Sequence, residues 1–146
     1  MALYHFSVRH VSRGKGQMVV ASAAYISGQR IYDGYYNKIH DYTSKSGVVF
    51  TEILTPEYVP ERMTDREILW NEVEHVERNN KAQLAYSFDI ALQNELTLEE
   101  NIRLAKEFCQ EQFVARGMIV DLAVHEGKSD NEEEPDNPHF HVLVPL

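Results

Sequence analysis

The sequence predicts an α+β fold, in which helices pack on one face of a largely antiparallel β-sheet. Apolar and polar residues alternate near the start, in the middle and at the end of the 146 residues, as they do in half-buried strands. Two segments combine helix-start signals with apolar residues at helical spacing. The chain has neither an internal repeat nor a linker-like segment, so we expect one domain over residues 1–146.

The first half of the chain is expected to contain one strand and one helix. Residues 2–9 alternate between two faces, which predicts a strand. The basic, glycine-containing segment 13–17 predicts a flexible loop. Residues 19–30 are rich in alanine and predict a helix, with Gly28 near its end. Residues 33–47 are polar and rich in tyrosine, and we expect them to be irregular.

The second half is expected to alternate strands with capped helices. A short strand is expected before Pro56, and three further strands follow from alternation, so that the set is residues 48–54, 84–91, 118–125 and 138–144. Thr64 with Glu67, and Thr97 with Glu100, have the spacing of a capping box, in which each side chain satisfies a free backbone N–H. Each pair therefore predicts the start of a helix.

Composition excludes several classes of protein. The 43% hydrophobic and 25% charged content fits a globular domain rather than a disordered chain. No apolar run approaches the roughly 20 residues that span a bilayer, and the first residues do not have the pattern of a signal peptide. A single cysteine, Cys109, fits a reducing compartment. We therefore expect a cytoplasmic bacterial protein without membrane insertion.

The charge is unevenly distributed along the chain. The net charge is −9, yet residues 1–50 carry +4 and the remainder −13, partly in an acidic run over 130–136 that we expect to be a solvated loop. The basic residues of the first part are candidates for phosphate contacts, although each one alone also fits a solvated surface charge: Arg9, Arg13, Lys15, Arg30, Lys38 and Lys45.

Three histidines form a candidate metal site. His139 and His141 are two apart on an expected strand, so both side chains point to one face. His125 ends the preceding expected strand, and the loop between the strands can bring it close. Two histidines alone would fit surface decoration, whereas a third favours a metal site with positions left open for a substrate oxygen. Asp89, on another strand, fits either an exposed acid or a group that orients a ligand or relays a proton.

Tyr25 lies among small residues in the segment 21–28, which leaves room for a molecule to approach its ring. From the residues alone, it fits a tyrosine that covers the core with its hydroxyl in water. A phenol with a pKa near 10 is a weak nucleophile unless a base or a cation lies nearby.

Several segments together resemble a known family. Three groups of residues are similar, in their order along the chain, to MobA/MobL-type plasmid mobilisation relaxases of the HUH endonuclease superfamily. They are the start of the chain with Ser22–Gly28, the segment Asp65–Glu74 (DREILWNEVE), and Val124–His125 followed by Asn137–His141 (NPHFH). The resemblance extends over nearly the whole chain.

The resemblance implies the HUH relaxase fold, a five-stranded antiparallel sheet with flanking helices. It implies that Tyr25 attacks single-stranded DNA at a plasmid transfer origin and leaves a 5′-phosphotyrosine and a free 3′-hydroxyl. It also implies that His125, His139 and His141 hold one divalent ion, Mn or Mg in function, with Zn, Ni or Co as other candidates. Accessory relaxosome proteins and a coupling protein are implied as further partners.

Two further expectations come from the comparison with this family. Relatives commonly carry acids at two alternating positions of the strand before Leu92, where this chain has Ser87 and Asp89, so Asp89 is the candidate for proton transfer or for orienting a histidine. Family members usually continue beyond the histidine strand. Residues 1–146 are therefore expected to be the catalytic domain from the N-terminal part of a longer protein.

Two other functions fit the same residues. A metallohydrolase would use the histidines to activate a hydroxide, without a covalent intermediate. A non-catalytic module would bind single-stranded nucleic acid on its sheet, with bases stacked on residues such as Tyr32, Tyr35, Tyr36 and Tyr42, which equally fit core or loop packing. Loss of the covalent adduct in a Tyr25→Phe variant would distinguish the relaxase from the hydrolase. DNA affinity kept in a His139→Ala, His141→Ala double mutant, with no bound metal and no nicking in the wild type, would indicate the binding module.

Overall fold

The computed structural model describes residues 5–131, 133 and 136–146. The α-helices in this part of the chain are α1 (Val19–Ser27), α2 (Arg66–Val76) and α3 (Leu98–Gln112). The strands are β1 (Phe6–Ser12), β2 (Arg30–Asp33), β3 (Lys38–Asp41), β4 (Val48–Leu54), β5 (Gln83–Ala91), β6 (Val120–His125) and β7 (His139–Pro145). Within the described residues, no helix has the length and apolar character needed to cross a membrane.

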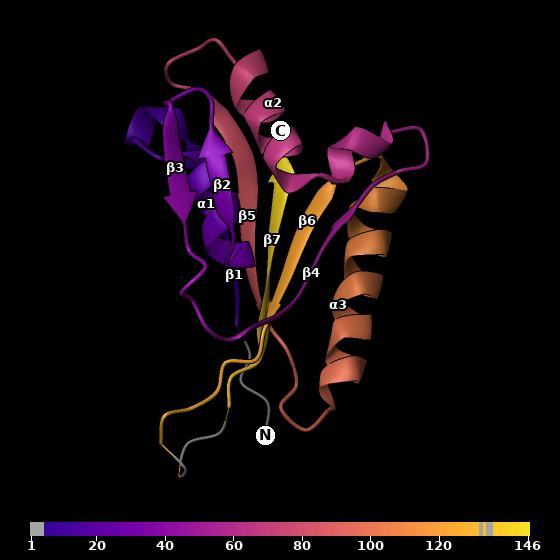
Figure 1. Cartoon of the computed structure of the whole chain (residues 1–146). Coiled ribbons are helices and arrows are strands. Elements are labelled where there is room, and N and C mark those ends of the chain that lie inside the picture. Colours follow the sequence, from indigo (N-terminus) through magenta and orange to yellow (C-terminus); the bar gives the residue numbers. More distant parts are fainter. Residues whose placement is uncertain (1–4, 132, 134–135) are drawn as a thin grey trace.

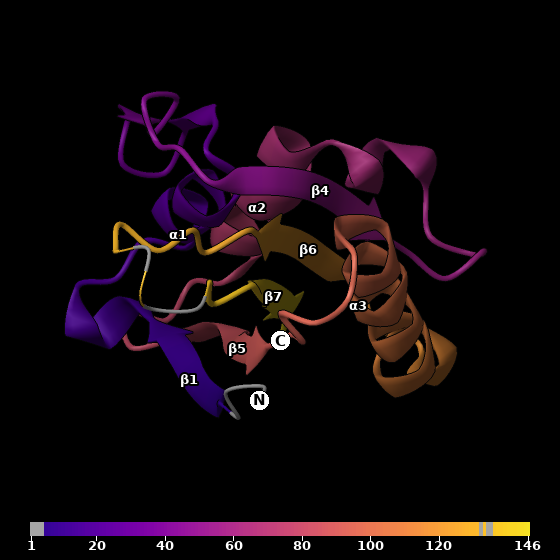
Figure 2. The same ribbon diagram turned by 90° about the horizontal axis from the view of Figure 1, so that it is seen from below.

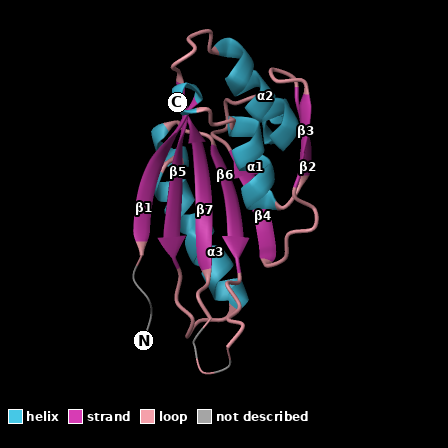
Figure 3. Ribbon diagram, turned by 90° about the vertical axis from the view of Figure 1, so that its left-hand side faces the viewer, coloured by secondary structure: helices cyan, strands magenta, loops and turns pink. Residues whose placement is uncertain are grey.

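The main sheet has five strands in the order β1-β5-β7-β6-β4, and every neighbouring pair is antiparallel (Figure 3). This confirms the predicted fold class. The centre of the sheet is β7, which pairs with β5 on one side and β6 on the other. The last strand of the chain therefore lies where both faces of the sheet are covered, and its side chains alternate between the two faces.

Helices cover both faces of the sheet, which corrects the expectation of a single covered face (Figures 1 and 2). One face packs on α1 and α2, with Ala23, Trp70, Ala123 and Leu143 in its core. The other packs on α3, with a core that includes Cys109, Leu122, Phe140 and Val142. The two cores follow directly from alternation, because neighbouring residues of β6 and β7 enter opposite cores.

The first helix lies close to the sheet because its buried positions are small. Val19, Val20, Ala23 and Ala24 are all fully buried. The helix ends at Ser27 rather than at residue 30, since Gly28 adopts a left-handed conformation with φ of 65° and its N–H bonds to the Ala24 carbonyl. These short buried side chains determine the distance between α1 and the sheet. They therefore also determine how far from the sheet Tyr25 lies, on the exposed face of the helix.

The segment 33–47 is only partly irregular, which corrects the expectation: β2 ends at Asp33 and pairs with β3 as a hairpin, whereas residues 42–47 form the expected irregular chain. Asn37, with φ of 51°, lies in the turn of the hairpin. The Asp33 carboxylate accepts hydrogen bonds from the backbone N–H groups of Tyr35 and Tyr36. Strands of only four residues leave too short an alternation to recognise in a sequence rich in tyrosine.

The first strand and the loop after it also differ from expectation. β1 runs from Phe6 to Ser12, four residues along from the predicted start, and residues 1–4 lie outside the described part of the chain. Residues Arg13–Lys15 then form a 3₁₀ turn rather than a flexible loop. The strand extends because β5 offers partners as far as Gln83, which pairs with Ser12.

Candidate active site

The structure brings His125, His139 and His141 together at one end of the two central strands. In the register of β6 and β7, His125 lies opposite His139, and Ala123 lies opposite His141. One nitrogen from each imidazole lies within 4.8 Å of one nitrogen of each other ring. Two adjacent antiparallel strands thus present three rings on one face, the face that α1 covers.

Backbone carbonyls fix the orientation of two of these rings. His125 Nε2 lies 2.8 Å from the Ile26 carbonyl oxygen, and His139 Nδ1 lies 2.8 Å from the Asn137 carbonyl oxygen. Because a carbonyl only accepts, each of these nitrogens carries the proton and donates it. The other nitrogen, Nδ1 of His125 and Nε2 of His139, then keeps its lone pair for a ligand. This arrangement is typical of histidines that bind metals.

The protonation of the cluster also suits a cation. Burial lowers the pKa of His125, and it lowers the pKa of His141 to about 4, since desolvation disfavours the imidazolium. Both rings are therefore neutral at pH 7 and can act as ligands. Three neutral, convergent nitrogen donors fit a divalent transition metal, with further coordination positions open toward the solvent.

Asp89 lies next to the cluster on β5, directly opposite His141 in the register with β7. Its carboxylate oxygen is 4.0 Å from Nε2 of His5, a residue that the sequence did not single out. The negative charge of Asp89 raises the pKa of His141, against the larger effect of burial. Its placement is compatible with orienting His141 or accepting a proton, and its role remains a prediction.

Tyr25 projects from α1 over the same face, and 50% of its surface is exposed. Tyr25 and His141 line one cavity of about 310 Å³, together with Arg9 of β1 and Ser87 of β5. The helix is also connected to the cluster, because the carbonyl that fixes His125 belongs to Ile26, the residue after Tyr25. The tyrosine near the start of the chain and a histidine near its end therefore face a common space.

Residues after the hairpin surround the Tyr25 ring. The Tyr42 ring packs edge-on against it, with ring centroids 5.3 Å apart. The ammonium of Lys45 lies 3.5 Å from the centroid of the Tyr25 ring and donates a hydrogen bond of 3.1 Å to the Tyr25 carbonyl. The sequence indicated Lys45 only as a candidate phosphate ligand, since its contact with a residue twenty positions earlier depends on the path of the hairpin.

The candidate phosphate ligands do not form one surface. Arg9 lines the Tyr25 cavity and Lys45 contacts Tyr25 itself, whereas Lys15 and Lys38 are exposed on the 3₁₀ turn and on the hairpin. Arg30 lies 3.9 Å from Asp41 on the neighbouring strand. Arg9 and Lys45 are thus the two cations of the set that the fold places at the tyrosine.

Arg13 is a correction to the predicted set. Its surface is only 7% exposed, and its guanidinium donates to the carboxylate of Glu74 and to three backbone carbonyls in and after α2. It also lies 4.3 Å from the centroid of the Tyr35 ring. A guanidinium enclosed in this way has a structural partner for its charge and is not free to bind a phosphate.

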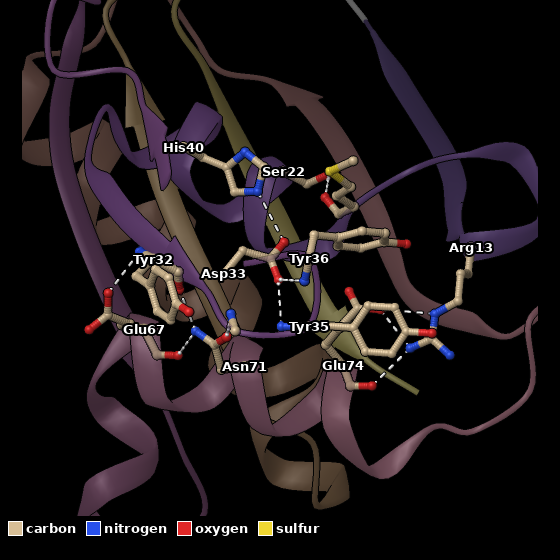
Figure 4. A network of polar contacts seen from close by, with 12 residues as sticks. Arg13, Ser22, Tyr32, Asp33, Tyr35, Tyr36, His40, Glu67, Asn71 and Glu74 are labelled. Carbon is tan, nitrogen blue, oxygen red and sulfur yellow. Dashed lines mark hydrogen bonds and ion pairs between the residues drawn. The ribbon is translucent and has the colours of Figure 1, made fainter. Parts of the chain in front are cut away.

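The DREILWNEVE segment has a structural role that explains its pattern (Figure 4). Glu67 accepts from the backbone N–H of Tyr32, and Asn71 both donates to the Tyr32 carbonyl and accepts from the Gly34 N–H. Glu74 pairs with Arg13 one turn further along. Side chains of helix α2 therefore hold the β2–β3 hairpin in place through hydrogen bonds to its backbone. Tyr42 and Lys45 lie in the segment that follows this hairpin.

This chain has relatives among known proteins. Residues 17–146 match the MobA/MobL family. The chain is 37% identical to the conjugal transfer protein TraA of Rhizobium radiobacter and 33% identical to the mobilization protein MobL of Acidithiobacillus ferridurans. These alignments cover 100% and 99% of this chain but only 14% and 38% of the relatives.

A solved structure from work on the molecular basis of vancomycin resistance transfer in Staphylococcus aureus is also similar. Its sequence is 41% identical, and the two structures superpose with a TM-score of 0.88 over 99% of this chain and 71% of the other. The family match, the sequence relatives and the shared fold agree with the resemblance noted in the sequence. The chain belongs to the MobA/MobL family.

Proposed function

We propose that this chain is the DNA-nicking domain of a plasmid mobilisation relaxase, in which Tyr25 attacks a phosphodiester of single-stranded DNA beside the histidine cluster. The observation that carries the proposal is the cavity shared by Tyr25 and His141. Membership of a family whose relatives are named as conjugal transfer and mobilisation proteins supports the same reaction. The substrate would be the single strand of a transfer origin.

In this reaction the phenolic oxygen of Tyr25 forms a bond to phosphorus, and the bond from phosphorus to the 3′ oxygen breaks. The products are a 5′-phosphotyrosine and a free 3′-hydroxyl, so the energy of the broken bond is kept for rejoining. A divalent ion held by His125, His139 and His141, with Mn or Mg as the first candidates, would supply Lewis-acid charge to the non-bridging oxygens. The phenolic proton must leave Tyr25 and the departing 3′ oxygen must gain one; Asp89, opposite His141 in the sheet, is the candidate acceptor.

The chain's own residues set the geometry of attack. The Ile26 carbonyl connects the helix that carries Tyr25 to the ring of His125, so the nucleophile and the ligand set keep a constant spacing. Arg9, in the same cavity, is placed to contact a phosphate of the bound strand. The exposed tyrosines of the hairpin, Tyr32 and Tyr35, offer faces on which bases could stack.

The test is a covalent-adduct assay with single-stranded oligonucleotides that span the transfer origin of the plasmid encoding the chain. A label at the 3′ end follows the part that becomes attached to the protein, and a label at the 5′ end follows the released strand with its free 3′-hydroxyl. Wild-type protein with Mn²⁺ is expected to yield both products, and EDTA is expected to prevent both. Tyr25→Phe is expected to yield neither.

Tyr58→Phe is the matched control, because Tyr58 is an exposed tyrosine whose hydroxyl donates to the Gly117 carbonyl after α3. It should retain full activity. Cleavage that survives in Tyr25→Phe would instead indicate a metallohydrolase. Binding without cleavage by the wild-type protein, with any of Mn, Mg, Zn, Ni or Co, would indicate a non-catalytic binding module.

A further inference from the structure

We infer that Lys45 is a positioning residue for the nucleophile: its ammonium holds the Tyr25 ring from one face and provides positive charge beside it as the phenol attacks. The inference rests on the proposed function. It assigns to Lys45 a role that acts through the tyrosine, distinct from a contact with the DNA backbone.

The first support is the pair of contacts that Lys45 makes with one residue. Its Nζ lies 3.5 Å from the centroid of the Tyr25 ring, well within the range of about 6 Å for a cation–π interaction. The same Nζ donates to the Tyr25 carbonyl at 3.1 Å. One group thus contacts both the side chain and the backbone of Tyr25, which fixes the ring relative to its helix.

The second support is the absence of a competing partner. Across residues 5–131, 133 and 136–146, no carboxylate lies within ion-pair distance of the Lys45 ammonium. The side chain is half-buried, and desolvation lowers the pKa of Lys45. Placing a cation in a partly desolvated position costs free energy, and among the described residues the Tyr25 ring and carbonyl are the groups that offset it.

The third support is the path of the chain between the two halves of the site. Tyr42 donates its backbone N–H to the Gln29 carbonyl and packs its ring against Tyr25, and its own carbonyl accepts from the Lys45 N–H. Two residues after Lys45, the Gly47 carbonyl accepts from the N–H of Glu126, next to His125. The segment 42–47 therefore connects the tyrosine to the histidine strand and fixes Lys45 between them.

The chemical consequence follows from where charge changes. As the phenol loses its proton, the ring gains negative charge, and a cation over the ring face attracts that form more strongly than the neutral phenol. A lysine whose part is only to bind phosphate would strengthen DNA binding without acting on the tyrosine. The two roles therefore differ in whether binding or the attack step is affected.

The experiment compares Lys45→Met, which keeps the length and loses the charge, with Lys45→Arg, which keeps the charge. The adduct rate is measured in a single turnover with saturating oligonucleotide and Mn²⁺, and the dissociation constant by fluorescence anisotropy in the Tyr25→Phe background. We expect Lys45→Met to slow adduct formation about tenfold. The dissociation constant should change less than about twofold, and Lys45→Arg should recover most of the rate.

Lys106→Met is the control, since Lys106 lies 5.7 Å from the centroid of the Phe50 ring on the α3 side of the sheet. A second measurement needs no activity: in protein with ¹³C-labelled tyrosine, the ring signal that is missing in Tyr25→Phe should shift in Lys45→Met and stay unchanged in Lys106→Met. Equal losses of rate and affinity, or an unmoved ring signal, would overturn the inference and leave the proposed function standing. A wild-type chain that forms no Tyr25 adduct would overturn both.

Discussion

Backbone carbonyl groups determine which ring nitrogen of two histidines at this site keeps its lone pair for a ligand. The Ile26 carbonyl leaves Nδ1 of His125 free, and the Asn137 carbonyl leaves Nε2 of His139 free. A histidine on an exposed strand would rotate and exchange tautomers, which would cost conformational entropy on binding a metal. Here part of that entropy is already lost in the folded chain, and this favours a ligand that needs all three nitrogens at once.

The candidate metal site leads to a prediction at this scale. His139→Gln should weaken Mn²⁺ binding by more than about tenfold, since loss of even an outer partner of a ligand commonly costs 10 to 100-fold. Isothermal titration calorimetry measures the change. His75→Gln, on the exposed side of α2, is the control. An unchanged affinity in His139→Gln would remove that ring from the ligand set.

Cys109 contributes to the hydrophobic core between α3 and the sheet. It is fully buried between α3 and the sheet, and burial raises the pKa of its thiol to about 12. Both effects make this thiol a poor nucleophile and a poor metal ligand in the folded chain. Its place in the α3 core agrees with the helical spacing of apolar residues in the sequence.

Among the elements, the two predicted capping boxes have different outcomes. At α3 the prediction is confirmed: the Thr97 hydroxyl accepts from the Glu100 N–H, and the Glu100 carboxylate accepts from the Thr97 N–H. At α2 it is wrong, because Asp65 caps the helix by accepting from the Ile68 N–H, and Thr64 belongs to a preceding 3₁₀ turn. Thr64 and Asp65 are adjacent and both suit a helix cap. Which of them caps α2 depends on the direction from which the preceding chain approaches the helix.

This difference can be measured at α2. Asp65→Ala should lower the free energy of unfolding by about 1 kcal/mol, the usual effect of losing a side chain that caps a helix. Thr64→Ala should lower it by less, since the Thr64 hydroxyl bonds only the Glu61 carbonyl of the turn. Urea denaturation followed by circular dichroism compares the two variants. A larger loss in Thr64→Ala would contradict the assignment of the cap.

Over the whole molecule, an ion pair between Arg66 and Asp121 joins helix α2 to β6, the strand that carries His125. Asp121 of β6 is fully buried and accepts three hydrogen bonds of 2.8 to 3.0 Å from the Nε and Nη2 groups of Arg66 and one of 2.8 Å from Trp70 Nε1. Arg66 and Trp70 both belong to α2. The register of α2 over β6 is therefore set by a charged contact as well as by apolar packing.

Loss of this contact should lower the free energy of unfolding of the whole domain. Asp121→Asn keeps the size of the side chain but leaves the partly buried charge of Arg66 without its counter-charge, and should cost about 3 kcal/mol of unfolding free energy. Arg62→Met, which removes an exposed ion pair with Glu72, is the matched control and should cost much less. Equal midpoints of urea denaturation for the two variants would show that the buried pair does not stabilise the fold.

The sequence by itself determined the fold class, the strands β5, β6 and β7, and the three histidines that the structure brings together, because alternation and spacing are local properties of the chain. The family was also recognisable in the order of its segments. These features need no knowledge of which elements pack together.

Only the tertiary structure decided which charged residues are available. Arg13, Arg9 and Lys45 are equivalent as basic residues in a sequence, yet one is enclosed by Glu74, one lines the tyrosine cavity and one contacts the tyrosine ring. The β2–β3 hairpin likewise could not be predicted from the sequence, because its short strands are stabilised by hydrogen bonds from side chains of α2. The physical reason is common to both. The free energy of a charge or of a short strand depends on partners far away in the chain, such as Tyr25 for Lys45, 20 positions away, and Glu74 for Arg13, 61 positions away.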